Sequence, residues 1–335
     1  MRFAFFFIVG AISAGCLSAQ QPTVSGPVEA LTFDAPTRSV RAVIGFPGAA
    51  SFGPALLDSL DLASIAPLQS YGIIFETGKC LLVSGLGSKT VSTVAIAGVT
   101  NYPDTIIWSG NGSLAVLYSH AGGWFQTISG FPSAPVAGAL VSVAALGGAF
   151  ATLAVDSAGK QIAVAVSGDK GGVYLASDGQ FSPLASMANP VSLSFSTDGE
   201  TLYALDAASI QVTAVSISSH GLQTLALPGI TNPVAIQSGE NAQNQQVLYV
   251  AAGSDRIVRV LNVATQQIVT DVPLNFQPTS LAQFGSSSFV LAWRSQSANP
   301  LWLFSSTPQP GAYFVPAVQL LPLDHKAAAI AGRTP

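Results

Sequence analysis

Charged residues are scarce in this sequence. Asp, Glu, Lys and Arg make up 8% of the 335 residues, and the formal net charge is −4. Lys and Arg form no cluster, which excludes the electrostatic footprint of nucleic-acid binding and a basic surface for anionic lipid. Apolar residues make up 49% of the chain, a share too high for a disordered protein. The 32 Gly and 21 Pro residues, without long helical periodicity, favour an all-β chain.

Cysteine is almost absent as well. Of the two Cys residues, Cys16 lies in the apolar N-terminus, so Cys80 has no partner for an internal disulfide in the mature chain. Within Cys-Leu-Leu-Val we interpret Cys80 as a buried small apolar residue. The sequence has no CxxC, HExxH or EF-hand loop and no glycine-rich phosphate loop. We therefore expect neither a metal site nor a cofactor.

The three histidines, His120, His220 and His325, do not suggest a ligand set. His120 and His220 follow Tyr-Ser and Ser-Ser in loops, and we interpret them as solvated turn residues. A Ser-His-Asp triad is a spatial arrangement that spacing does not test, and no Gly-x-Ser-x-Gly elbow supports one. The catalytic residues, if any, are therefore unknown from the sequence.

Six acidic residues fall near expected turns, where capping of Asx-turns is their expected role. They are Asp156, Asp169, Asp178, Asp198, Asp206 and Asp255. Hydrolysis of a sugar would need two of them facing one cleft, which their spacing does not indicate.

The N-terminus has the pattern of an export signal. Met1-Arg2 is a charged start, residues 3–12 are apolar, and Leu17-Ser18-Ala19 is a small-residue cleavage site. This predicts a signal peptide over residues 1–19 and a secreted or periplasmic protein. Ser13-Ala14-Gly15-Cys16 also resembles a bacterial lipoprotein signal, and the alternative is therefore a lipoprotein anchored through Cys16.

An uncharged, mostly apolar run covers residues 134–155. A membrane-spanning helix is one interpretation by length, but Pro135, three Gly residues and flanks without Lys or Arg oppose it. We expect a buried strand followed by a long connection, and no membrane span in the mature chain.

Short strands with tight polar turns are clearest in residues 246–273, where three strands follow one another. A meander of this size needs similar neighbours to bury its faces. Pro190, Pro233 and Pro278 each precede a β-run and stand 43 and 45 residues apart. Asp198-Gly199 is the type of turn that a tight hairpin needs. A four-stranded repeat of this period predicts a β-propeller.

Six modules can be delimited, namely Asp61–Pro103, Asp104–Pro135, Val136–Asn189, Pro190–Asn232, Pro233–Gln277 and Pro278–Val315. A strand pair in Val28–Phe46 is left over, followed by a link over Gly45–Leu60. The mature length favours about seven four-stranded antiparallel blades, with six as the alternative.

We predict a single propeller domain over residues 28–318, preceded by a flexible lead-in over 20–27 and followed by a tail over 319–335. The leftover pair looks like the third and fourth strands of a module. Left alone it would be an exposed hairpin. We therefore expect the N-terminal strands to close the ring by pairing with strands between Leu281 and Val318.

Two segments resemble a known repeat. Phe195-Ser-Thr-Asp-Gly-Glu-Thr-Leu-Tyr-Ala-Leu-Asp206 and Leu248-Tyr-Val-Ala-Ala-Gly-Ser-Asp-Arg-Ile-Val-Arg-Val260 resemble the repeats of YVTN-type β-propellers. The resemblance covers most of residues 61–317 and implies a secreted or surface propeller of the WD40-like shape. A lactonase-like propeller enzyme is related to it by fold only.

The aromatic residues give few functional signals. Trp108 and Trp293 occupy comparable strand positions, which core packing explains, and Trp124 is expected to be the most exposed Trp. Asn111-Gly112-Ser113 matches both a glycosylation acceptor and a hairpin turn, and we favour the turn.

We expect a binding or scaffold propeller for an unidentified extracytoplasmic protein or glycan, leaning away from an enzyme. Its ligand would dock on rim loops or over the central channel, with Gly45–Leu60 and Gly130–Gly148 as the variable parts. The alternative is a lactonase-like or other hydrolytic enzyme with polar side chains converging at the channel mouth. A third hypothesis is self-association through a weakly charged surface.

Overall fold

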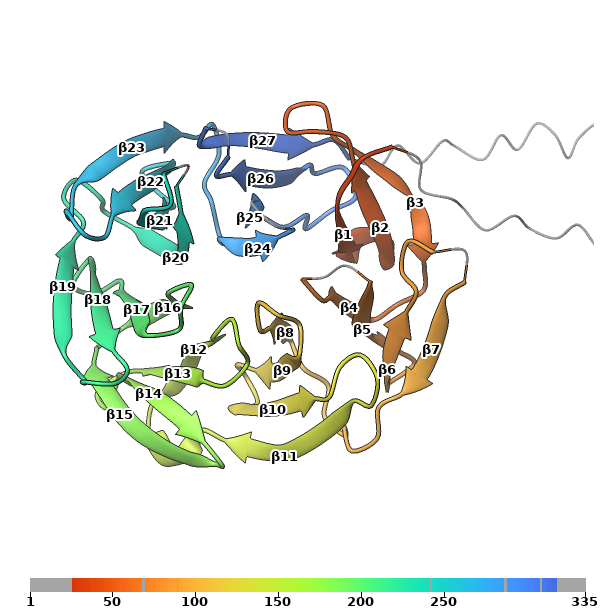
Figure 1. The fold of residues 1–335 in the computed structure, drawn as a ribbon, viewed down its shortest axis with the longest axis horizontal. Coiled ribbons are helices and arrows are strands. Elements are labelled where there is room, and N and C mark those ends of the chain that lie inside the picture. Colours follow the sequence, from red (N-terminus) through yellow and green to blue (C-terminus); the bar gives the residue numbers. More distant parts are fainter. Residues whose placement is uncertain are drawn as a thin grey trace, which may run out of the picture.

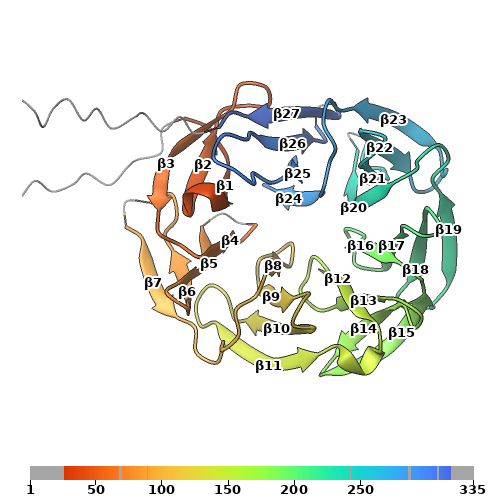
Figure 2. The same cartoon turned by 180° about the vertical axis from the view of Figure 1, so that it is seen from behind.

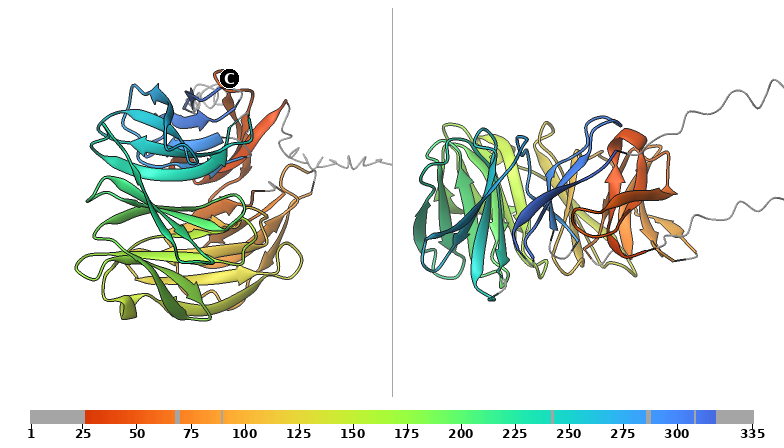
Figure 3. Two further views of the ribbon diagram at one scale, coloured as in Figure 1. Left: turned by 60° about the vertical axis from the view of Figure 1, so that its left-hand side comes forward. Right: turned by 90° about the horizontal axis from the view of Figure 1, so that it is seen from above.

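A computed structural model describes residues 26–317, except 68–69, 89, 242, 286–287 and 308. The described chain forms seven antiparallel sheets arranged as a ring around a central axis (Figure 1), and the ring is a flat disc when viewed edge-on (Figure 3). The predicted all-β, seven-bladed propeller is therefore confirmed. The predicted signal peptide, Cys16, His325 and the predicted tail lie outside the described residues.

The first blade has three strands, β1 (Val28–Asp34), β2 (Ser39–Ile44) and β3 (Ser51–Leu57). The second has β4 (Leu62–Ile65), β5 (Tyr71–Glu76), β6 (Lys79–Ser84) and β7 (Ser92–Ala95), and the third has β8 (Thr105–Trp108), β9 (Leu114–Ser119), β10 (Trp124–Ser129) and β11 (Val136–Ser142). The fourth has β12 (Ala149–Val155), β13 (Ile162–Ser167), β14 (Gly172–Ser177) and β15 (Gln180–Ser186).

The remaining blades follow the same order, from the axis outward (Figures 1 and 2). The fifth has β16 (Pro190–Phe195), β17 (Thr201–Asp206), β18 (Gln211–Ser216) and β19 (Leu222–Ala226). The sixth has β20 (Pro233–Glu240), β21 (Gln246–Ala252), β22 (Ile257–Asn262) and β23 (Ile268–Pro273). The seventh has β24 (Ala282–Phe284), β25 (Ser288–Ala292), β26 (Leu301–Ser305) and β27 (Gly311–Val315).

Turn chemistry fixes the hairpins as the sequence predicts. In the turn between β16 and β17, Gly199 has φ +76°, a conformation that suits glycine. Asp198 Oδ1 accepts hydrogen bonds from Ser196 Oγ at 2.5 Å and from the Glu200 N–H at 3.0 Å. The hydrogen bond from Ser196, followed by the Glu200 amide, lowers the pKa of Asp198. The carboxylate therefore belongs to the hairpin.

The core lies between neighbouring blades. Tyr203 and Leu205 of the fifth blade pack with Leu248 and Val250 of the sixth, and all four are at most 1% exposed. Each blade buries its faces against the next, which is the reason an isolated blade would not be stable. Cys80 is buried in the core between the second and third blades, and burial raises the pKa of its thiol to about 12. Its interpretation as a small apolar core residue is confirmed.

The apolar run over 134–155 is not a helix. It forms β11, a single 3-10 turn (Ala144–Leu146) and then β12. Among the described residues, no helix is long and apolar enough to cross a membrane.

Two predicted boundaries are wrong. Val136 begins the fourth strand of the third blade rather than a new module. The Pro before it led to the error, because Pro135 precedes an outermost strand here, whereas Pro190 and Pro233 begin innermost ones. The predicted link over Gly45–Leu60 contains β3, whose Gly-Pro pair hid its strand character.

The innermost strand of the first blade, β1, runs in the opposite direction to the innermost strands of the other blades. In a four-stranded blade, the turn between the second and third strands lies on the same face of the ring as the links between blades. We call this the link face and the other the opposite face. The β1–β2 turn lies on the link face, because Arg38 in that turn accepts a hydrogen bond from Leu60 N–H, just before β4, at 3.0 Å. β1 thus runs against β4 and has the polarity of a second strand.

The two ends of the ring meet through side chains. Ala30 and Val43 of the first blade pack with Val290, Leu303 and other buried residues of the seventh. The N-terminal strands therefore close the ring, as predicted. The predicted hydrogen-bonded pairing with strands between Leu281 and Val318 is wrong for the described residues, because β1, β2 and β3 form a sheet of their own. Val28–Phe46 holds the second and third strands of a blade by polarity, not the third and fourth.

Candidate functional site

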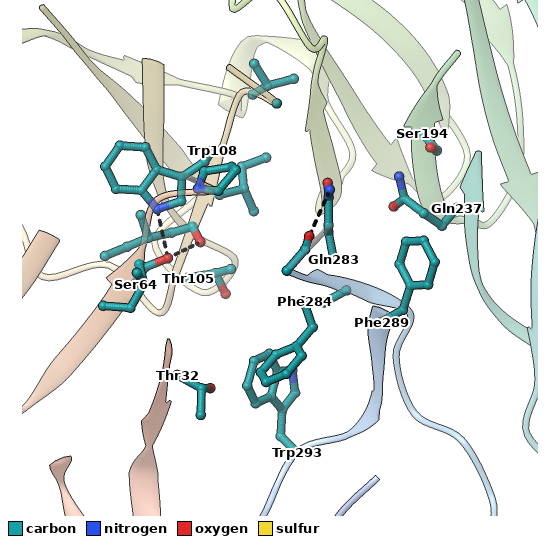
Figure 4. Close-up of a pocket in the computed structure, with 18 of the residues that line it drawn as sticks. Thr32, Ser64, Thr105, Trp108, Ser194, Gln237, Gln283, Phe284, Phe289 and Trp293 are labelled. Carbon is teal, nitrogen blue, oxygen red and sulfur yellow. Dashed lines mark hydrogen bonds between the residues drawn. The ribbon is translucent and has the colours of Figure 1, made fainter. Parts of the chain in front are cut away.

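The centre of the ring encloses a cavity of about 900 Å³. Its wall is built by the innermost strand of every blade, from β1 through β4, β8, β12, β16 and β20 to β24, together with residues after β25 and β26. Figure 4 shows side chains from several blades pointing toward this space. A concave site at the axis is thus available to a ligand, as cavities of this size are in other folds.

Neutral groups dominate the polar part of the wall. Hydroxyl and amide side chains come from Thr32, Ser64, Thr105, Ser194, Gln237, Ser238 and Gln283. Four charged residues border the cavity, Asp34, Asp104, Glu240 and Arg294. Because hydroxyl, amide and apolar groups make up most of the wall, and Asp34 and Arg294 are paired, the cavity suits an uncharged ligand better than an anionic one.

Trp108, the last residue of β8, is fixed in orientation at the cavity wall. Its indole Nε1–H donates to Ser64 Oγ of the neighbouring blade at 3.0 Å, as Figure 4 shows. Its ring meets Tyr71 edge-on at 5.9 Å and Phe131 at 4.8 Å between centroids. Trp108 therefore has both the predicted packing role and a position on the cavity wall that the sequence did not reveal.

Trp293 lies at the other side of the wall, in the turn after β25. It is 49% exposed, although the sequence predicted a core residue. The position of Trp293 in the sequence was misleading. Trp293 lies one residue beyond the end of β25, where its side chain turns from the core toward the rim of the cavity. Trp124, expected to be the most exposed Trp, is 8% exposed in the core and was wrongly predicted.

Serine hydroxyls join the innermost strands of the fifth and sixth blades. Ser192 Oγ accepts from Ile236 N–H at 3.1 Å, and Ser194 Oγ accepts from Ser238 N–H at 3.0 Å. The Ser238 hydroxyl in turn donates to the carbonyl of Phe195. Within the described part of the chain, no hydrogen bond joins the side-chain amide of neighbouring Gln237 to another group. The Gln237 amide can therefore both donate a hydrogen bond to a ligand and accept one from it.

Asp34 and Arg294 neutralise each other at the edge of the cavity. Arg294 Nη1 lies 2.7 Å from Asp34 Oδ1, and the two side chains are 2% and 0% exposed. Thr37 Oγ1 donates to the second carboxylate oxygen at 2.5 Å, and Arg294 Nε donates to the carbonyl of Asn299 at 2.7 Å. The pair serves the fold, so neither charge is available to a ligand.

Asp104 pairs with His120 on the link face. His120 Nδ1 lies 3.1 Å from Asp104 Oδ1, and the His120 backbone N–H donates to Oδ2 at 2.8 Å. The same kind of contact recurs elsewhere, where Asp255 accepts from Thr231 N–H at 2.8 Å. Both contacts join a link to the turn between the second and third strands. The recurrence identifies the Asp104–His120 pair as a structural bridge between those loops.

The remaining predicted site residues stay apart. Asp156 and Asp206 cap turns, accepting from Lys160 N–H at 2.7 Å and Ala208 N–H at 3.0 Å, as predicted. His220 is an exposed turn residue with φ +57°, also as predicted. Asn111 Oδ1 accepts from Ser113 N–H at 3.0 Å, which confirms the hairpin interpretation. Among the residues that the structure describes, no three His, Cys, Asp or Glu come together as a metal site would require.

The hydrolytic alternative required carboxylates or histidines converging at the channel mouth. Of the three carboxylates on the wall, Asp34 is held by Arg294 and Asp104 by His120, while Glu240 is exposed at the end of β20. Among the described residues, the Asp104–His120 pair comes nearest to a carboxylate and a histidine that converge at the channel mouth. His120 itself is not part of the cavity wall.

Comparison with known proteins shows the fold alone. No family model and no curated protein matches the sequence. Among solved structures, the chain is similar to dihydro-heme d1 dehydrogenase NirN in complex with DHE, with a TM-score of 0.54 and 13% identity over 90% of this chain. The match spans 66% of that protein's chain.

Two further solved structures are similar to the chain at low identity. Streptogramin B lyase is similar at a TM-score of 0.55 and 10% identity, over 84% of this chain and 87% of the lyase. A nidogen/laminin complex matches at a TM-score of 0.45 and 12% identity, over 73% of this chain and 92% of that chain. The dehydrogenase and the lyase are named as different enzymes, so the shared fold does not select a function.

Proposed function

We propose that this protein is a secreted or periplasmic binding propeller that takes a neutral, hydroxyl-rich ligand, such as a glycan, in its central cavity. The observation that carries the proposal is the cavity wall. The half-exposed Trp293 and the oriented Trp108 border it together with neutral hydroxyl and amide groups. Apolar surface with a few convergent polar groups is the usual composition of a small-molecule site.

The chemistry of the wall fits a sugar for two reasons. An indole offers a large apolar face against which the C–H face of a sugar ring can pack. Gln237 supplies an amide that can donate and accept, and Thr32, Thr105 and Gln283 add neutral partners. Since Asp34 and Arg294 bind each other, the ligand would meet no unbalanced charge from that pair.

The proposed location outside the cytoplasm rests on the N-terminal export pattern and on the resemblance to YVTN-type repeats. Both are sequence arguments. The alternative within this proposal is a lipoprotein attached through Cys16, with the same binding function.

Titration calorimetry of the mature protein with a panel of neutral oligosaccharides tests the proposal. Binding should fall about five- to thirtyfold in Trp293→Ala and in Gln237→Ala, since each removes a wall contact worth about 1–2 kcal/mol. Phe314→Ala is the matched control, because Phe314 is also 49% exposed but lies on the outermost strand β27. Absence of binding across the panel, or equal losses in the control, would refute a glycan site in the cavity.

A hydrolytic function is the second candidate, favoured by one observation, the Asp104–His120 pair. A carboxylate at Nδ1 is the arrangement that orients a general-base imidazole. Release of product from lactone and ester substrates by the mature protein, abolished in His120→Gln, would support it. If turnover is absent, or persists unchanged in that variant, the pair has only its structural role.

A further inference from the structure

The wall of the central cavity reaches both faces of the ring. It includes Ala35, Asp104 and Trp293, which lie in turns and links on the link face. It also includes Gly110 and Ser157, which follow the innermost strands β8 and β12 in turns on the opposite face. In the described part of the chain, the wall is therefore that of a channel along the axis rather than of a cup closed at one face.

The channel is long and narrow. The innermost strand β12 runs from the link face to the opposite face and has seven residues, which corresponds to about 20 Å at the usual rise per residue. Over that length, the cavity of about 900 Å³ has a mean cross-section of about 45 Å². This width suits one unbranched chain of sugar rings, and it is too small for a folded protein.

An indole lies toward each end of the channel. Trp293 follows β25 in a turn on the link face and is 49% exposed. Trp108 is the last residue of β8, so it lies toward the opposite face, where its indole N–H donates to Ser64. Figure 4 shows the two indoles at separate places around the cavity. Because they lie toward different faces, one short sugar cannot contact both.

Neutral polar groups are spread along the channel between its two ends. Thr105 begins β8 on the side of the link face, and Gln237 and Gln283 lie within β20 and β24. Ser157 and Thr197 follow β12 and β16 on the opposite face. A ligand that runs along the axis therefore meets hydrogen-bonding groups near both faces and between them, whereas a single sugar ring meets only some of them.

Contacts between blades keep the ring around the channel closed. On the opposite face, the Asn111 N–H donates to the carbonyl of Ser157 at 2.9 Å and joins the third blade to the fourth. On the link face, the buried ion pair of Asp34 and Arg294 joins the first blade to the seventh. Because the ring stays closed, a chain that occupies both ends of the channel must enter by one of its own ends.

We propose that the channel takes a linear, neutral polysaccharide chain that is threaded along the axis and projects from both faces. This inference rests on the proposed binding function and narrows its ligand to an unbranched chain with at least one accessible end. Branch points and bulky groups at both ends exclude a chain, because they cannot pass through a closed ring.

Titration calorimetry of the mature protein with unbranched glucose oligomers, derived from cellulose and from amylose, tests the length requirement. Affinity should rise at least about tenfold from the disaccharide to the octasaccharide, because only the longer chain reaches both ends of the channel. Trp293→Ala and Trp108→Phe should each weaken binding of the octasaccharide, and at most one of them should weaken binding of the disaccharide. Equal affinity for all lengths would overturn the proposal.

Octasaccharides with biotin at one end or at both ends test threading itself, by surface plasmon resonance on the immobilised protein. Monovalent streptavidin bound at one end should leave binding unchanged, whereas streptavidin bound at both ends beforehand should slow association at least about tenfold. Streptavidin added at the second end after the complex has formed should trap the chain and slow its release at least about tenfold. Unchanged binding of the doubly blocked chain would show that the chain does not pass through the ring.

These outcomes separate the inference from the function on which it rests. If short or doubly blocked oligosaccharides bind as well as the free octasaccharide, the cavity holds a glycan but no chain is threaded, and only the inference is wrong. The same conclusion follows if only branched or single-ring sugars bind. If no neutral oligosaccharide binds at all, the inference and the proposed function both fail. Phe314→Ala, on the outermost strand β27, should leave every one of these affinities unchanged.

Discussion

Arg294 and Asp34 form a buried ion pair across the closure of the ring. The two residues are 260 positions apart in the chain, and Nη1 of the arginine lies 2.7 Å from Oδ1 of the aspartate. Arg294 also lies over the ring of Phe52 at 5.1 Å, so one side chain contacts two strands of the first blade. The pair explains how the ring closes at its link face through side chains.

Replacing Asp34 by Ala should destabilise the protein by about 3–5 kcal/mol, because it leaves the arginine buried without its counter-charge. Urea unfolding followed by far-UV circular dichroism measures the loss. Arg38→Ala is the control, since the Arg38–Asp61 pair is exposed, and its loss should cost at most about 1 kcal/mol. Similar losses in both variants would contradict a special role of the buried pair.

Stability should fall as pH rises above 9. Burial raises the pKa of Tyr118 and of Tyr203 from 10.0 to about 12, and that of Cys80 from 9.0 to about 12. Above the ordinary pKa values the unfolded chain loses these protons while the folded chain keeps them, so the free energy of unfolding decreases until about pH 12.

Thermal melts between pH 8 and 11 measure this trend, with tyrosinate absorbance as a second signal. Cys80→Ala should move the onset from about pH 9 to about pH 10, the ordinary pKa values of thiol and phenol. The Tyr118→Phe, Tyr203→Phe variant should flatten the decline above pH 10. A melting temperature that stays constant from pH 8 to 11 would show that these groups titrate alike in both states.

Deleting residues 20–46 should abolish cooperative unfolding or make the protein insoluble. The deletion removes β1 and β2, which pack against the seventh blade through Ala30 and Val43, and leaves β3 without a partner. A deletion of residues 20–25 alone should be tolerated if these residues are only a lead-in. Calorimetry and solubility check both variants. An unchanged melting temperature in the longer deletion would refute the closure role of the first blade.

The mature N-terminus should begin at Gln20 after export, because Leu17-Ser18-Ala19 has the small residues of a cleavage site. Intact mass of the protein recovered from a bacterial periplasm or medium measures this. A mass that corresponds to a diacylated chain starting at Cys16 would establish the lipoprotein alternative. Recovery of the uncleaved chain in the cytoplasm would contradict both.

Sequence reasoning predicted the fold because the repeat is encoded in local chemistry. Asp-Gly and Asn-Gly turns, such as Asp198-Gly199, are tied to hairpins by the φ that glycine allows. The three modules from Pro190 to Val315 match the observed blades closely. The module boundary at Pro135 was wrong, because a proline at the start of a strand does not say whether that strand is the first or the fourth.

The candidate site was less predictable for a physical reason. The cavity collects one strand from each of seven blades, so its composition depends on how all of them are placed around the axis. Trp108 and Trp293 looked equivalent in sequence, but one is held by Ser64 and the other is half exposed at the rim. The alternation of residues along a strand assigns each residue to one face of the sheet. It does not show whether the residue lies near the central axis or at the rim of the cavity.

The reversed direction of β1 determines the face of the ring on which the described chain begins. β1 begins on the opposite face, and β27, which pairs Val315 with Leu301, ends on the link face. A membrane anchor, or a tag fused before Gly26, is therefore attached to the opposite face. If the protein is held at a membrane through Cys16, the rim that carries Trp293 points away from the lipid and toward whatever the envelope presents. A surface-immobilised protein tethered by its N-terminus would keep the link face, and the cavity rim that carries Trp293, accessible.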